Sequence, residues 1–196
     1  MSAQSWTLRY VISSPNNAQA IISSLPDTLR THIEGIISRH PEWAPDLANY
    51  RVEATWIVQD WESLSNILQS GAHGPEISKA RVLQAISERD FLKIPDLLKD
   101  ARRQIGSTIS ANHRTYVRNY SALLDLHMLH DLDIIQSTST DLVRMQNISE
   151  ANKDAHRRSR ISELKETMSN RLSTISPSFK YQEPVLSMRR AGFNLV

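Results

Sequence analysis

Apolar side chains recur at helical spacing along almost the whole chain. Between residues 28 and 39 they stand three or four positions apart, and Pro26 and Pro41 bound the segment, which predicts an amphipathic helix. A second helix is predicted over residues 47–58, after Asp46, a residue suited to cap a helix. Residues 52–58 also alternate apolar and polar as a strand would, but the helical pattern is longer and its neighbours are helical.

The same spacing continues to the end of the chain. Asp60 is predicted to cap a helix over residues 61–68, a loop follows at 70–75, and further helices are predicted at 77–88 and 91–105. The second of these has Phe91, Ile94, Leu98, Ala101 and Ile105 on one side. The longest helix is predicted over 113–136, and two more cover 161–172 and the segment that starts near Pro184.

These helices predict an all-α fold in which antiparallel helical hairpins stack as an α-solenoid, like tetratricopeptide or HEAT arrays. Residues 1–15 match no element, and 16–136 form the main helical-repeat region. Residues 137–159 are rich in Ser, Thr, Asn and charge, which predicts a polar linker. Residues 160–196 add further helices, with an incomplete repeat at the C-terminal end.

Composition excludes several classes of protein. The chain has no cysteine, so it has neither a disulfide framework nor a thiol nucleophile, and it suits a reducing compartment. A net charge of +2 is too balanced to indicate nucleic acid or a membrane surface. No apolar run approaches the roughly 20 residues of a membrane span, so we expect a soluble intracellular protein.

Few residues form a pattern that is typical of a catalytic or binding site. His127 and His130 stand one helical turn apart, with Asp131 and Asp133 nearby, but zinc needs a third well-placed ligand, so packing histidines are the better interpretation. A basic cluster contains no aromatic side chain to stack on bases. It consists of Lys153, His156, Arg157, Arg158 and Arg160. We therefore predict no catalytic, cofactor-binding or metal-binding residue in this chain.

Three tryptophans, Trp43, Trp56 and Trp61, fall within one predicted hairpin. Clustered tryptophans can mark a binding groove. They more often form the large core of a helix pair, and that interpretation is favoured here.

Three stretches carry a resemblance to a known family. Residues 50–64 read YRVEATWIVQDWESL, residues 101–111 are followed by YVRNY at 116–120 and LHMLHDL at 126–132, and residues 181–190 read YQEPVLSMRR. In this order and spacing they resemble the FAT domain of phosphatidylinositol 3-kinase-related protein kinases, specifically the ATR branch and its fungal members. The match covers residues 41–195. Its motif positions are Tyr50, Glu53, Ala54, Trp56, Trp61, Ser110, Ala111, Tyr116, Arg118, Tyr120, His127, Met128, Leu129, Glu183, Pro184, Leu186, Arg189 and Arg190.

The resemblance implies packing roles for these positions and a non-catalytic helical scaffold for the chain. It implies part of a nuclear serine/threonine kinase of the DNA damage checkpoint and repair response. ATP and magnesium would belong to a kinase domain that this chain lacks. The implied partners are the rest of the kinase, its regulatory subunit and a second copy, with no direct nucleic acid and no membrane. Two alternatives stay open: a free-standing helical-repeat adaptor for a protein or peptide, and a small helical protein that binds metal or nucleic acid.

Overall fold

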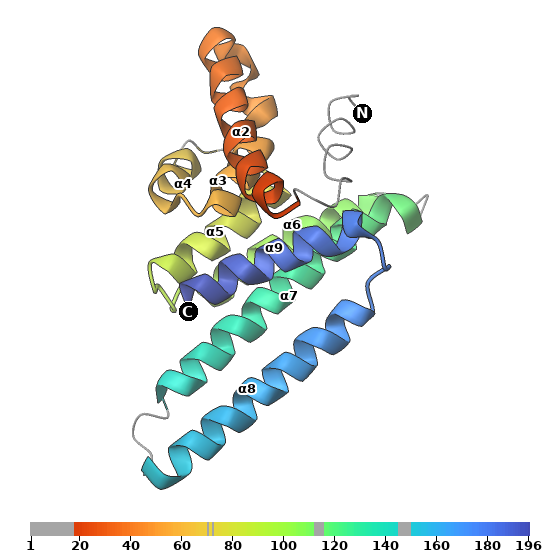
Figure 1. Cartoon of the computed structure of the whole chain (residues 1–196). Coiled ribbons are helices and arrows are strands. Elements are labelled where there is room, and N and C mark those ends of the chain that lie inside the picture. Colours follow the sequence, from red (N-terminus) through yellow and green to blue (C-terminus); the bar gives the residue numbers. More distant parts are fainter. Residues whose placement is uncertain (1–17, 70, 72, 112–115, 145–149) are drawn as a thin grey trace. The chain divides into compact units, whose positions relative to one another are not determined.

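The computed structural model describes residues 18–69, 71, 73–111, 116–144 and 150–196. Within these ranges the chain forms helices joined by turns and loops and contains no strand (Figure 1). The predicted all-α class is therefore confirmed. The strand alternative for residues 52–58 is wrong, because those residues lie within a helix. The unmatched segment 1–15 lies outside the described residues.

The chain divides into two compact units between residues 72 and 73. The N-terminal unit contains α2 (Ala18–Arg39), the short 3-10 helix η2 (Pro41–Trp43), α3 (Ala44–Val58) and α4 (Trp61–Leu68). Helix α3 packs against both α2 and α4. It ends at Val58 and is followed by Gln59, whose φ is 66°. The next residue caps α4 as expected, since Asp60 Oδ1 accepts a hydrogen bond from the backbone N–H of Ser63 at 3.0 Å.

The C-terminal unit contains α5 (Pro75–Ser87), α6 (Ile94–Ala111), α7 (Tyr116–Arg144), α8 (Glu150–Ser173) and α9 (Phe179–Leu195). Helix α7 packs against each of the other four, and α9 folds back on α5 and α7 (Figure 1). Neighbouring helices pack as in an α-solenoid, although a tetratricopeptide or HEAT arrangement stays a prediction. The core is formed mainly by Ile77, Val82, Leu83, Ile86, Ile94, Leu98, Ala101, Ile105, Leu129, Leu132, Ile135, Met168, Val185 and Met188.

Helix α6 agrees with the buried side that apolar spacing predicted, but its two ends differ from the prediction. Ile94, Leu98, Ala101 and Ile105 are all buried, as predicted. Phe91 is 46% exposed, because the helix begins only at Ile94 and leaves Phe91 in the preceding turn. The helix was predicted to end at Ile105, but α6 continues to Ala111.

The polar segment 137–159 is largely helical, so the expected linker is wrong. Helix α7 runs on to Arg144 and α8 begins at Glu150. Hydroxyl groups on this part of α7 donate back to carbonyls of the preceding turn, as Thr140 does to Gln136 at 3.0 Å. This satisfies them without leaving the helix. The ion pair between Arg160 and Asp141, at 2.9 Å, then joins α8 to α7.

The last helix begins earlier than its sequence predicted. Pro184 was expected near the first helical position, but it lies inside α9. The helix begins at Phe179 because the extended residue Ser178 offers its carbonyl to the N–H groups of Tyr181 and Gln182, both at 3.0 Å. In the part of the chain that the structure describes, no helix is long and apolar enough to cross a membrane.

Candidate functional site

A buried carboxylate joins the last three helices of the C-terminal unit. Asp131 on α7 is fully buried. Its Oδ1 accepts a hydrogen bond from Arg171 Nε of α8 at 2.5 Å, and its Oδ2 accepts one from Arg189 Nε of α9 at 2.7 Å. A buried charge is tolerated only when it is paired and hydrogen-bonded, and here each oxygen has its own guanidinium. We call Asp131, Arg171, Arg189 and His127 the ionic cluster.

Both arginines of the ionic cluster also donate hydrogen bonds to backbone carbonyls. Arg189 Nη1 donates to the carbonyl of Met168 on α8 at 2.9 Å, and Arg171 Nη2 donates to the carbonyl of His127 at 3.2 Å. Arg171 therefore ties α8 to α7, and Arg189 ties α9 to both α7 and α8. The planar guanidinium suits this task because it presents several donors in a fixed geometry.

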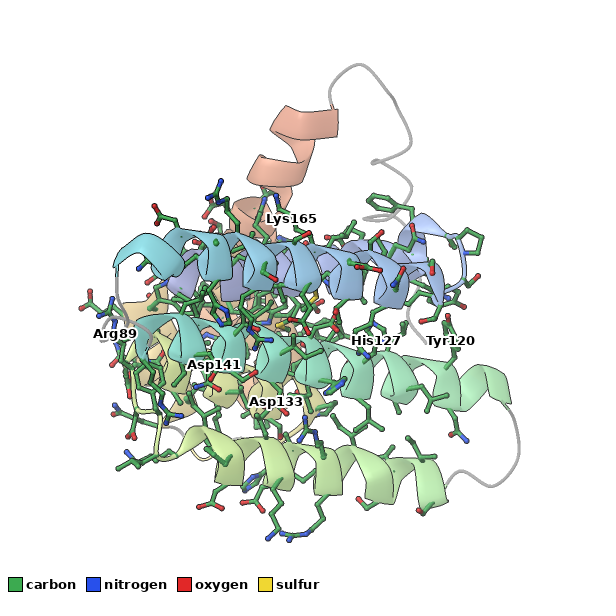
Figure 2. The ribbon with its side chains drawn as sticks, turned by 90° about the horizontal axis from the view of Figure 1, so that it is seen from below. Arg89, Tyr120, His127, Asp133, Asp141 and Lys165 are labelled. Atoms are coloured by element: carbon green, nitrogen blue, oxygen red, sulfur yellow. The ribbon has the colours of Figure 1, made fainter. Side chains whose placement is uncertain are left out.

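His127 completes the ionic cluster on the side of α7 that faces α8 and α9 (Figure 2). Its Nε2 lies 3.5 Å from Asp131 Oδ2 and is buried without a hydrogen bond. Burial lowers the pKa of His127 below its ordinary value, and Arg171 and Arg189 act in the same direction, while Asp131 opposes them. The imidazole is therefore neutral near pH 7 and serves as a packing group.

The two histidines of the sequence motif have different environments. His127 is largely buried, whereas His130 is exposed on the same helix. Among the described residues, no group of three His, Asp or Glu side chains could hold a metal ion. In the basic cluster, His156, Arg157 and Arg158 are exposed, Arg160 is bound to Asp141, and the side chain of Lys153 lies outside the described residues.

Around the ionic cluster, α9 lies very close to α7. A Cβ atom on Gly192 would stand 2.9 Å from Leu132 Cδ2 and 3.4 Å from Ile135 Cδ1, so only glycine allows this approach without a shift. Nearby, the hydroxyl of Tyr120 accepts a hydrogen bond from the Ser176 N–H at 3.0 Å, and its ring packs edge-on against Tyr181 with the ring centroids 4.7 Å apart. These contacts fix the turn between α8 and α9.

Several motif positions converge on this region. Met128 and Leu129 are buried on α7 next to the ionic cluster, and Arg189 belongs to it. Leu186 and Arg190 instead face outward on α9, and Glu183 and Pro184 are half-buried. Ser110 is exposed on α6. The side chains of Ala111, Tyr116 and Arg118 lie outside the described residues.

The first of the three motif-bearing stretches, residues 50–64, lies in the N-terminal unit. Ala54 and Trp56 are buried on α3, Glu53 and Trp61 are half-buried, and Tyr50 is exposed. Trp43 does not join the expected tryptophan core. It is 48% exposed and stacks on the ring of His40, with 4.6 Å between centroids.

A polar groove of about 630 Å³ runs across this N-terminal unit. Two ion pairs line it: Arg30 with Asp60 at 2.5 Å, and Arg51 with Glu34 at 2.6 Å. Both cations thus already have carboxylate partners. The groove offers hydrogen-bonding groups but no unpaired charge that would select an ionic ligand.

Sequence reasoning missed a second buried charge. Lys79 on α5 is 2% exposed and donates to Glu76 Oε1 and to Asp125 Oδ1 of α7, both at 2.6 Å. Burial alone would lower the pKa of Lys79, but the two carboxylates raise it above its ordinary value. Burial also raises the pKa of Glu76. This ion triad joins α5 to α7 as the ionic cluster joins α7 to α8 and α9.

These arrangements are suited to holding helices together. In the ionic cluster, the histidine has no hydroxyl or thiol to activate, and the carboxylate is occupied by both arginines. Nucleophilic catalysis needs a nucleophile within hydrogen-bonding reach of its base, and the ionic cluster contains no such pair. The geometry therefore supports a structural role.

Comparison of the sequence with known proteins identifies a family. A model of the FAT domain matches residues 48–195. The chain is similar to the serine/threonine-protein kinase ATR of Arabidopsis thaliana, with 24% identity over 180 residues, and to that of Oryza sativa subsp. indica, with 22% over 176 residues. These alignments cover 85% and 84% of this chain but only 6% of each kinase. No solved structure matches the chain significantly.

Proposed function

This chain belongs to the FAT domain family, and from that premise we propose that it is a non-catalytic helical scaffold of an ATR-type kinase in the DNA damage checkpoint and repair response. The observation that carries the proposal is the ionic cluster. It lies where the motif-bearing stretches of α7 and α9 meet, and its groups hold helices instead of reacting. The curated relatives are named as serine/threonine kinases, and this chain spans about 6% of their length.

As a scaffold, the chain would act by presenting rigid helices to other proteins. The proposed partners are the rest of an ATR-type kinase and its regulatory subunit, in the nucleus. Phosphotransfer, with ATP and magnesium, would belong to a kinase domain, and this chain would contribute neither cofactor nor catalytic residue. Direct contact with nucleic acid and association with a membrane are not expected.

A phosphotransfer assay tests the non-catalytic part of the proposal. The purified chain is incubated with radiolabelled ATP, magnesium and a mixed protein substrate, beside an intact ATR kinase as positive control. No labelled product above the protein-free blank is expected. Transfer that copurifies with the folded chain would overturn this part.

Capture from cells tests the scaffold part. The tagged chain is expressed in cells of its own species, cross-linked and isolated from nuclear extract, and we expect an ATR-type kinase polypeptide or its regulatory subunit to be enriched. The matched control is Gly192→Leu, which removes the close approach of α9 to α7 and should lose this enrichment. Enrichment of neither protein by the folded chain would contradict the proposal. Enrichment of one unrelated protein alone would favour the adaptor alternative.

A further inference from the structure

The ion triad of Glu76, Lys79 and Asp125 contains two acidic groups and a single basic one. Lys79 Nζ donates to Glu76 Oε1 and to Asp125 Oδ1, both at 2.6 Å. The side chains of Lys79, Asp125 and Glu76 are only 2%, 16% and 20% exposed. If both carboxyl groups were ionised, one ammonium would face two carboxylates. A buried charge is tolerated only when it is paired, so the triad would hold one negative charge too many.

One oxygen atom of the triad shows where this excess lies. Glu76 Oε2 is buried and has no hydrogen-bond partner, whereas Asp125 has no oxygen in that condition. A buried carboxylate oxygen without a donor loses its hydration and gains nothing in return, and the loss is larger for a charged group than for a neutral one. A proton on Oε2 makes Glu76 neutral, and Oε1 still accepts the hydrogen bond from Lys79.

The helices around the triad do not supply the missing positive charge. Helix α6 meets this end of α5 through Gln104, an uncharged amide that accepts a hydrogen bond from the Ser78 hydroxyl at 2.6 Å. Helix α9 also packs on α5, but its buried arginine belongs to the ionic cluster. Among the described residues, Lys79 and Asp125 are the charged groups that act on Glu76.

The start of α5 opposes protonation of Glu76 only weakly. Glu76 lies in the first turn of the helix, where the helix dipole favours a negative charge. This effect is small beside the cost of removing a carboxylate from water. Burial therefore raises the pKa of Glu76 above its ordinary value, although Lys79 opposes the change, and Asp125 adds to it.

We propose that the ion triad is a pH-sensitive switch in which a proton on Glu76 Oε2 keeps α5 joined to α7. At pH 7 the proton is bound, Lys79 and Asp125 form a neutral pair, and Glu76 is a neutral hydrogen-bond acceptor. When the proton passes to solvent at higher pH, two carboxylates compete for one ammonium and the start of α5 loosens from α7. The switch lies within the C-terminal unit and does not depend on the proposed kinase context.

Infrared spectroscopy of the full chain detects this proton directly. A protonated carboxyl group has a carbonyl stretching band that is separate from the bands of carboxylates. We expect such a band at pH 7 in the unmodified chain and its loss in Glu76→Gln. The matched control is Glu88→Gln, since Glu88 is exposed at the end of the same helix and its change should leave the band intact. A chain without the band, or a band that remains in Glu76→Gln, would overturn the proposal.

Urea unfolding followed by far-ultraviolet circular dichroism distinguishes the two acidic groups. Glu76→Gln reproduces the shape and neutrality of the protonated side chain, so its unfolding midpoint at pH 7 should equal or exceed that of the unmodified chain. Asp125→Asn removes the carboxylate that balances the buried ammonium of Lys79 and should lower the folding equilibrium constant at least about tenfold. Equal losses in both variants, or failure of Glu76→Gln to fold, would mean that both groups are ionised and would overturn the proposal.

The pH dependence tests release of the proton. Above the ordinary pKa of glutamic acid, about 4.3, the unfolded chain loses this proton while the folded chain keeps it. The stability that the proton contributes is therefore full below that pH and is lost as the pH rises through the raised pKa of Glu76. Comparison with Glu76→Gln at each pH cancels the contribution of His127, which has the opposite sign.

Two results are expected from this comparison. The stability of Glu76→Gln relative to the unmodified chain should increase from about pH 5 to pH 8. Near pH 7 the unmodified chain should also release about one more proton on unfolding than the variant does. A difference in stability that stays constant over this range, with equal proton release, would overturn the switch.

Discussion

Replacing Asp131 by asparagine removes the one negative charge of the ionic cluster with almost no change of shape. Arg189 is only 7% exposed, whereas Arg171 is 23% exposed and can turn outward. Breaking a buried ion pair from one side costs about 3–5 kcal/mol. Since only one of the two cations stays trapped, we expect a loss of about 3 kcal/mol, at the low end of that range. For a unit of this size, this lowers Tm by roughly 10 °C.

Urea unfolding followed by far-ultraviolet circular dichroism measures this loss. Tryptophan fluorescence serves as an internal reference, because Trp43, Trp56 and Trp61 lie in the N-terminal unit and the C-terminal unit contains no tryptophan. The matched control is Asp133→Asn, which makes the same change two residues away. Asp133 pairs with Arg102 at 2.8 Å, and both side chains are more than a third exposed, so about 1 kcal/mol or less is expected.

The reasoning would be refuted if Asp131→Asn cost no more than Asp133→Asn. A second test separates the net contribution of the ion pair to stability from the cost of leaving a buried arginine without its carboxylate. Asp131→Leu combined with Arg189→Met removes both partners and leaves apolar side chains of similar size. Such replacements are often neutral or stabilising, so the double variant should recover a large part of the stability lost in Asp131→Asn.

Three further predictions concern local features of the fold. Because burial lowers the pKa of His127, the unfolded chain protonates this imidazole more readily than the folded chain does. The free energy of unfolding should therefore fall as the pH drops below about 6.5. Urea titrations at several pH values measure this slope, and His127→Gln should flatten it. Gly106→Ala should raise the free energy of unfolding by about 0.5–1 kcal/mol through helix propensity, and so raise Tm, because nothing lies within 4 Å of the new methyl group. Gly192→Ala should gain nothing, because its methyl group meets Leu132. Equal gains in the two variants would contradict this difference. Asp60→Ala should destabilise the N-terminal unit by about 1 kcal/mol through loss of the helix cap, measured by tryptophan fluorescence, while Asp60→Asn should lose less than half of that.

The helices could be predicted because their apolar residues recur at a period that only a helix can bury on one side. The stripe from Ile94 to Ile105 on α6 was confirmed on this basis. The same logic failed at residues 137–159, where polarity was taken as absence of helix. Ser and Thr hydroxyls can bond to carbonyls of the preceding helical turn, so a polar stretch can continue a helix when a partner such as Arg160 ties it to its neighbour.

The ionic cluster could not be assembled from the sequence, because its members are far apart along the chain. Arg171 and Arg189 follow Asp131 by 40 and 58 residues. One signal was nevertheless present. Asp131 occupies a position in the buried stripe of α7, between Met128 and Ile135, and a charge at such a position requires a buried partner. In the sequence this aspartate was weighed only as an oxygen ligand for a metal.

The adjacent residues Arg189 and Arg190 show why a motif alone does not assign roles. Both belong to the stretch that resembles the ATR branch, yet they point about 100° apart around the helix axis. Arg189 turns inward to Asp131 and Met168, and its charge is neutralised within the unit. Arg190 turns outward and is exposed on the surface of α9. One arginine therefore holds α9 in its own unit, whereas its neighbour lies on the exposed face and takes no part in that ion pairing.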